Sequence, residues 1–145
     1  MASMSGLRWV RIVVCALAAM VCAYIAVFGI VMVYAVMLGF EAMGQPDQAQ
    51  INAFAGKWAP ILGPIAGFVF AFLFGLLAAR TPHNRFMHGL MTGVLFGGVS
   101  LVLGLLGDIS VGTFLSPLLL VLGGAAAGKL AARKETPETT TTLEG

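Results

Sequence analysis

The chain has 145 residues, of which 59% are hydrophobic and only 10% are charged. An average soluble domain carries about 25% charged residues, so this composition excludes a soluble monomer and predicts a protein that lies in lipid. The basic residues behind the net charge of +2 are few and scattered. We therefore expect no binding to nucleic acid.

The first apolar stretch predicts a membrane span over residues 12–40. No charge interrupts it, and as a helix it is roughly 43 Å long, against about 30 Å of hydrocarbon core. The apolar part of a signal peptide is only about 7–15 residues long, so this stretch is interpreted as a retained helix. Cys15 and Cys22 lie within it on one helix face and are interpreted as small packing residues.

The polar segment 41–57 predicts a short amphipathic helix on the membrane surface. Apolar residues recur at helical spacing from Ile51 to Trp58. Asp47 is placed to cap this helix at its N-terminus. Lys57 and Trp58 would lie at headgroup depth, where amphipathic side chains collect.

Three further spans are predicted over residues 59–79, 88–107 and 114–132. Pro60 and Pro64 fall near the start of the second span, where proline is best tolerated. Residues 135–145 are rich in Thr and Glu and predict a disordered cytoplasmic tail, although the closing Leu143–Gly145 also fits a remnant of an expression tag. The predicted fold is therefore all-α: one four-helix transmembrane domain over residues 1–134.

The basic residues predict the orientation of the spans. Seven of the eight lie at helix ends that share one side of the membrane, namely Arg8, Arg11, Arg80, Arg85, Lys129, Arg133 and Lys134. Cytoplasmic loops carry such an excess of Lys and Arg, so both termini are expected in the cytoplasm. The predicted location is the plasma (inner) membrane of a bacterium.

Small residues recur at every fourth position in three of the spans. The rows comprise Gly63, Gly67, Ala71 and Gly75, then Gly89, Gly93 and Gly97, then Gly124 and Gly128. Small residues let helix backbones approach closely in lipid. The rows either pack the helices of one chain together or pair with another copy or a larger complex. With three rows in so small a bundle, some self-association is expected.

Charged residues are scarce at bilayer depth, where only Lys129 falls near the inner end of a span. Intramembrane ionisable groups mark proton relays and ion sites, so this pattern argues against a proton-coupled carrier. The remaining hydroxyl groups are interpreted as helix-to-helix hydrogen-bonding groups. They belong to Tyr24, Tyr34, Thr92 and Ser100.

One cluster of side chains carries recognisable chemistry. Arg80, His83, Arg85 and His88 surround the start of the third span. Cations there, beside helix N–H groups, predict a contact with anionic lipid, and the alternative is a topology signal within a polar loop. The two histidines stand five residues apart without a nearby Cys or carboxylate, which is a poor metal-ligand pattern. No catalytic residue, metal site or cofactor is expected.

Two functions remain open from the sequence. The favoured hypothesis is a helix-packing protein that oligomerises or serves as an accessory subunit of a membrane complex. The alternative is a small oligomeric channel or facilitator for ions or uncharged solutes, with a path lined by Gly, Ser, Thr and Tyr. A membrane enzyme ranks third, because few polar groups share one depth.

Overall fold

The computed structural model describes residues 8–45, 47–80, 84–106 and 111–133, with side chains in the last range described from residue 114 onward. These ranges contain the helices α1 (Trp9–Glu41), α2 (Gln48–Ala78), α3 (Arg85–Leu106) and α4 (Val111–Arg133). All four are long and apolar enough to cross a membrane. The protein is thus an all-α, multi-pass membrane protein, as the sequence predicts.

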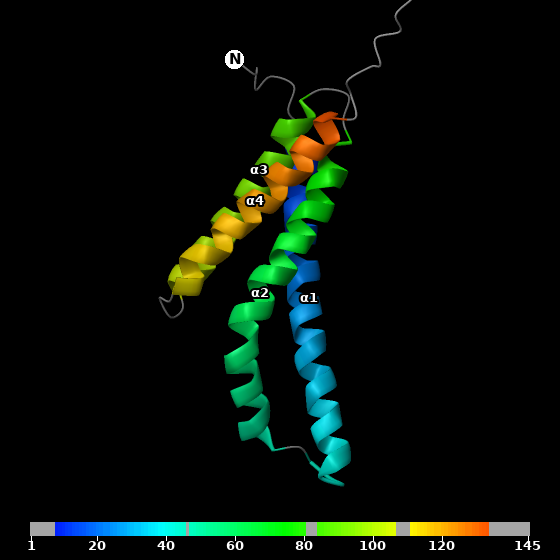
Figure 1. Ribbon diagram of the computed structural model, residues 1–145, viewed down its shortest axis with the longest axis vertical. Helices are drawn as coiled ribbons and strands as arrows, with labels where there is room; N and C mark the ends of the chain where they lie inside the picture. Colours follow the sequence, from blue (N-terminus) through cyan, green and yellow to red (C-terminus); the bar gives the residue numbers. More distant parts are fainter. Residues whose placement is uncertain (1–7, 46, 81–83, 107–110, 134–145) are drawn as a thin grey trace, which may run out of the picture.

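The helices form two antiparallel hairpins of unequal length (Figure 1). The α3–α4 hairpin lies along only one half of the longer α1–α2 hairpin. It diverges from that hairpin toward the end of α3 and the start of α4. In the half that is shared, α3 contacts α1 and α2, while α4 packs on α2 and α3. The remaining half of the α1–α2 hairpin therefore extends alone beyond the four-helix region.

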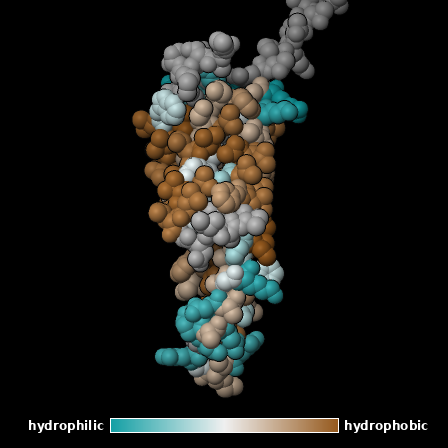
Figure 2. Space-filling view, turned by 90° about the vertical axis from the view of Figure 1, so that its left-hand side faces the viewer, coloured by the Kyte–Doolittle hydropathy of each residue, from teal (hydrophilic) through white to brown (hydrophobic). Residues whose placement is uncertain are grey.

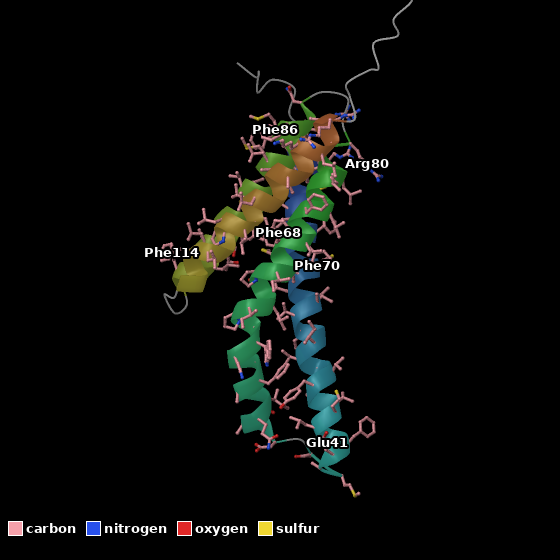
Figure 3. The ribbon with its side chains drawn as sticks, in the orientation of Figure 1. Glu41, Phe68, Phe70, Arg80, Phe86 and Phe114 are labelled. Atoms are coloured by element: carbon pink, nitrogen blue, oxygen red, sulfur yellow. The ribbon has the colours of Figure 1, made fainter. Side chains whose placement is uncertain are left out.

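The two ends of the molecule differ in charge. The end here named the arginine end carries arginines at or beside helix termini: Arg8, Arg11, Arg80, Arg85 and Arg133. The opposite end, named the hairpin end, holds the α1–α2 connection with Glu41 and Asp47. Figure 3 shows Glu41 and Arg80 at these opposite ends.

Helix α2 is one continuous helix where the sequence predicted two elements. The amphipathic segment that begins at Gln48 runs directly into the span and does not form a separate helix. Its predicted cap is confirmed, because Asp47 Oδ1 accepts a hydrogen bond of 2.9 Å from the backbone N–H of Ala49. The helix bends about midway (Figure 1), in the part of its sequence that contains Pro60 and Pro64. Proline removes a helical hydrogen bond, which is a recognised cause of such bends.

Two contacts fix the register of α1 against α2. At the arginine end, the Arg11 Nη2 atom donates a 2.5 Å hydrogen bond to the Leu77 carbonyl oxygen, one of the last carbonyls of α2. Near the hairpin end, the rings of Tyr34 and Phe54 stack with centroids 3.9 Å apart. The same number of residues separates these contacts on each helix, so the two helices remain side by side over nearly their whole length.

The closest packing occurs between α3 and α4 at glycines. A Cβ atom added to Gly124 would lie 2.5 Å from the Gly89 carbonyl oxygen and 2.7 Å from Gly93 Cα. One added to Gly128 would lie 2.5 Å from the Phe86 carbonyl oxygen. Backbone atoms cannot move aside as a flexible side chain can. A side chain at either position would therefore force the two helices apart.

Glycines of α2 have two different surroundings. A Cβ atom on Gly75 would lie 2.9 Å from Ala127 Cβ, and one on Gly67 would lie 2.6 Å from the Leu120 side chain. In contrast, a Cβ atom on Gly63 would meet nothing within 4 Å. The small residues of α2 thus contact α4 in the shared half and face open space where the hairpins diverge.

The core of the shared half is built from small and apolar residues. Its buried members are Ala16, Ala19, Ala23, Ala71, Phe96 and Leu120. Alanines on α1 bring that helix close to its neighbours, and the larger Phe96 and Leu120 fill the remaining space. Toward the hairpin end this filling stops, and a cavity begins.

Candidate functional site

Three of the four residues that the sequence grouped into a lipid-contact cluster lie in the described part of the chain, at the arginine end. Arg80 is exposed after the end of α2, and His83 lies outside the described residues. Arg85 is half-buried at the start of α3, with its Nη1 atom 3.5 Å from the Ala131 carbonyl oxygen near the end of α4. A contact of Arg80 and Arg85 with an anionic headgroup stays a prediction.

His88 does not belong to an exposed cluster, because its side chain is fully buried. Its Nε2 atom accepts a hydrogen bond of 3.2 Å from the backbone N–H of Arg8, so its Nδ1 atom, 3.0 Å from the Asn84 carbonyl oxygen, carries the proton and donates there. Arg8 is the N-cap residue of α1 and has no side-chain cap of its own. The histidine therefore joins the starts of α1 and α3, and contact with a lipid headgroup is not available to it.

A cavity of about 360 Å³ lies between the hairpins. All four helices line it, through Met20, Ala23, Tyr24 and Val27 of α1, Ala59, Pro60, Gly63, Pro64 and Gly67 of α2, Phe96 and Ser100 of α3, and Ser116 and Leu120 of α4. The lining residues of α3 and α4 belong to the halves of these helices nearest their connection, where the hairpins diverge in Figure 1. The cavity thus occupies the angle between the hairpins.

The cavity is mainly apolar and contains a few uncharged polar groups. Its lining residues include three that carry a hydroxyl group, Tyr24, Ser100 and Ser116. None of these hydroxyls hydrogen-bonds to another residue in the described part of the chain. Few polar groups in a mostly apolar concavity of this size are typical of small-molecule sites.

The other hydroxyl groups predicted to link helices have different contacts. Thr92 is fully buried, and its Oγ1 atom donates a 2.8 Å hydrogen bond to the carbonyl oxygen of His88, one turn earlier in the same helix. The ring of Tyr34 stacks on Phe54 across the α1–α2 hairpin. In the described residues neither hydroxyl links two helices.

Sequence reasoning missed the cavity and the role of Ser116 in it. The prolines of α2 were interpreted only as residues that start a helix, and Gly63 as one member of a packing row. The available signal was the combination of Pro60, Gly63, Pro64 and Gly67 on one stretch of helix. The prolines bend the helix, and Gly63, which has no side chain, leaves space that no neighbouring helix fills.

The α1–α2 hairpin presents two unlike faces where it extends beyond α3 and α4. Figure 2 shows a mainly hydrophobic surface over the shared half and hydrophilic residues over the extending part on the face seen there. The α2 segment here includes exposed Gln48, Gln50 and Asn52. Helix α1 instead exposes large apolar side chains at helical spacing, here named the α1 stripe, namely Val33, Val36, Met37 and Phe40.

Metal-ligand groups do not gather in the described residues: no set of three or more His, Cys, Asp or Glu side chains lies close enough to hold an ion. Comparison of the chain with protein-family models, with curated proteins and with solved structures finds no match. Interpretation of function therefore depends on the extending hairpin and the cavity.

Proposed function

We propose that this protein is an interaction subunit of a membrane assembly, and that it binds its partner, a second copy or another subunit, through the extending part of the α1–α2 hairpin. The observation that carries the proposal is the α1 stripe, an apolar helix face beside a polar segment of α2. The depth of each part of the hairpin relative to the membrane decides whether this face meets lipid or protein.

About 20 helical residues cross a hydrocarbon core of ~30 Å. Helices α3 and α4 have 22 and 23 residues and match this thickness, whereas α1 and α2 have 33 and 31. If the hydrocarbon core begins at the Arg11–Leu77 hydrogen bond, a length of about 20 residues ends near Val31 on α1 and near Trp58 on α2. The Lys57 Nζ atom lies 5.9 Å from the centroid of the Trp58 ring. Such a pair suits the headgroup layer.

The α1 stripe therefore lies beyond the hydrocarbon core. The Tyr34–Phe54 stack holds this part of α1 beside the segment of α2 that begins with Gln48 and includes Gln50 and Asn52. Amide side chains at those positions suit water or headgroups and not lipid tails. Yet Val33, Val36, Met37 and Phe40 are 61%, 53%, 59% and 81% exposed. A contiguous apolar face in a polar environment is a typical protein–protein contact surface.

We place the arginine end in the cytoplasm, following the excess of Lys and Arg in cytoplasmic segments. The extending hairpin then projects to the outer side of a bacterial plasma (inner) membrane. A partner of the α1 stripe lies on that same side, either as a second copy of this chain or as a larger membrane subunit with an outer apolar face.

The alternative of a channel or facilitator has less support. A path through one chain would have to pass the level of His88 and Thr92, whose side chains are fully buried and hydrogen-bonded. At the same level the α3 and α4 backbones approach closely at Gly89 and Gly124. Solute flux into reconstituted vesicles well above that of empty vesicles would favour the alternative.

The proposal is tested by the mass of the assembly extracted in native-lipid discs. The wild-type chain is expected in particles that contain a second copy or another protein. The double variant Val36→Ser, Met37→Ser removes apolar surface from the α1 stripe and is expected to reduce the assembled fraction several-fold. Val10→Ser is the matched control, because Val10 is an exposed residue at the other end of α1.

A wild-type particle with one copy and no other protein would contradict the proposal. Retention of the full assembly by the double variant would contradict the assignment of the contact to the α1 stripe.

A further inference from the structure

We propose that the cavity between the two hairpins binds an uncharged, lipid-soluble molecule that carries a hydroxyl or carbonyl oxygen on a hydrocarbon chain. This inference is independent of the interaction proposed for the α1 stripe. It depends on the depth of the cavity, on the chemistry of its lining and on the space that Gly63 leaves open.

The depth of the cavity in the membrane favours a ligand that dissolves in lipid. Its α1 lining extends from Met20 to Val27, which places it roughly 14–24 Å along the helix from Arg11, in the middle and outer parts of the hydrocarbon core. None of its lining residues, all of which belong to the described part of the chain, is charged. An ionic headgroup would have no counter-charge at this depth and would be costly to place there.

The polar residues of the lining favour a ligand that carries a hydrogen-bonding oxygen. Ser100 and Ser116 belong to different helices and line the same cavity. Thr92, by comparison, satisfies its hydroxyl on the carbonyl oxygen of His88, whereas neither serine has a side-chain hydrogen bond among the described residues. A hydroxyl both donates and accepts, so it suits a neutral alcohol or carbonyl.

The prolines of α2 remove helical hydrogen-bond donors beside the cavity. In a helix the carbonyl oxygen of residue 60 would accept from the N–H of residue 64, but residue 64 is proline and has no N–H. Pro60 and Pro64 both line the cavity. Backbone polar groups freed by proline within a membrane are satisfied by neighbouring groups, water or bound molecules. A ligand hydroxyl would serve as a donor here.

Gly63 allows a test that fills the cavity without disturbing a packed contact. It lines the cavity, and a Cβ atom on it would meet nothing within 4 Å. Gly98 on α3 also has nothing within 4 Å of an added Cβ atom but does not line the cavity. Gly63→Leu and Gly98→Leu therefore form a matched pair, because each adds the same side chain to a helix at an open position.

The experiment uses the full chain in phosphatidylcholine vesicles and a diazirine-labelled hexadecanol as probe, with a diazirine-labelled hexadecane as the hydrocarbon comparison. We expect the alcohol to label cavity-lining peptides several-fold more than the hydrocarbon, and unlabelled hexadecanol to compete with it. Gly63→Leu should remove this excess, whereas Gly98→Leu should retain it. The double variant Ser100→Ala, Ser116→Ala should reduce the excess labelling by the alcohol several-fold.

Equal labelling by the two probes would overturn the proposal, because it would mean that lipid chains enter the cavity without polar recognition. Labelling that unlabelled hexadecanol does not reduce would also overturn it. If Gly63→Leu does not fold, as judged by its helix content and elution volume, the serine variant alone decides, since it changes only two oxygen atoms.

Discussion

At the scale of single residues, the contact between α3 and α4 depends on the absence of side chains at a few glycines. We predict that Gly124→Ala destabilises the protein by about 1–3 kcal/mol, the usual cost of overpacking a core. The added Cβ atom would lie 2.5 Å from the carbonyl oxygen of Gly89, and backbone cannot yield there without separating the helices. Unfolding by SDS in mixed micelles, followed by circular dichroism, measures this change.

Gly98→Ala is the control for this prediction. Its added Cβ atom meets nothing within 4 Å, so the substitution should be neutral or should stabilise the helix by up to about 1 kcal/mol through helix propensity. Equal stability of the two variants would show that α3 and α4 do not approach each other this closely in the membrane.

The burial and hydrogen-bond partners of His88 could not be predicted from residue type and spacing. The sequence places this histidine beside two arginines and predicts a surface cluster, but its fully buried ring accepts from Arg8 and donates to Asn84. Arg8 is 80 positions away in sequence. Which backbone N–H a side chain will satisfy depends on the arrangement of the helices, and no local pattern encodes that arrangement.

At the scale of elements, the extending part of the hairpin is held together by aromatic contacts. We predict that Phe54→Ala loosens this part, because it removes the ring that stacks on Tyr34 at a centroid distance of 3.9 Å and contacts Trp58 at 6.2 Å. Such aromatic pairs contribute about 0.5–1.5 kcal/mol each. Hydrogen exchange of the α1 and α2 backbone amides near the hairpin end should become several-fold faster.

The effect of Phe54→Ala should remain local, with exchange in α3 unchanged. Phe114→Ala is the matched control, because Phe114 is an exposed ring at the far end of the α3–α4 hairpin, as labelled in Figure 3. Unchanged exchange near the hairpin end of the Phe54→Ala variant would mean that the stack does not hold the two helices together.

The sequence predicts the helices well, for a physical reason. In lipid, the backbone N–H and C=O groups must form hydrogen bonds within the protein. A long apolar stretch therefore forms a helix. The start of α2 was also predictable from Asp47, whose side chain caps it. The sequence did not indicate that the amphipathic segment and the second span share one axis, because a proline marks a possible boundary but does not require one.

At the scale of the whole molecule, the arrangement of the hairpins was not predictable from the small-residue rows. Rows with the same four-residue spacing occur on α2, α3 and α4, and spacing alone does not say which of them meet. In the structure, Gly89 faces Gly128 and Gly75 faces Ala127, while Gly63 faces open space. The cavity follows from this incomplete match and therefore appears only once the helices are assembled.

We propose that the arginine end lies on the cytoplasmic side of the membrane and that the hairpin end projects from its outer side. Single cysteines in a background of Cys15→Ala and Cys22→Ala test this claim through labelling with a membrane-impermeant maleimide. Gln50→Cys should react fully in intact cells and Arg133→Cys only after permeabilisation. Ile25→Cys should react in neither case, because the proposed depth puts it inside the hydrocarbon core. Reaction of Arg133→Cys in intact cells, or protection of Gln50→Cys until the cells are opened, would contradict the account.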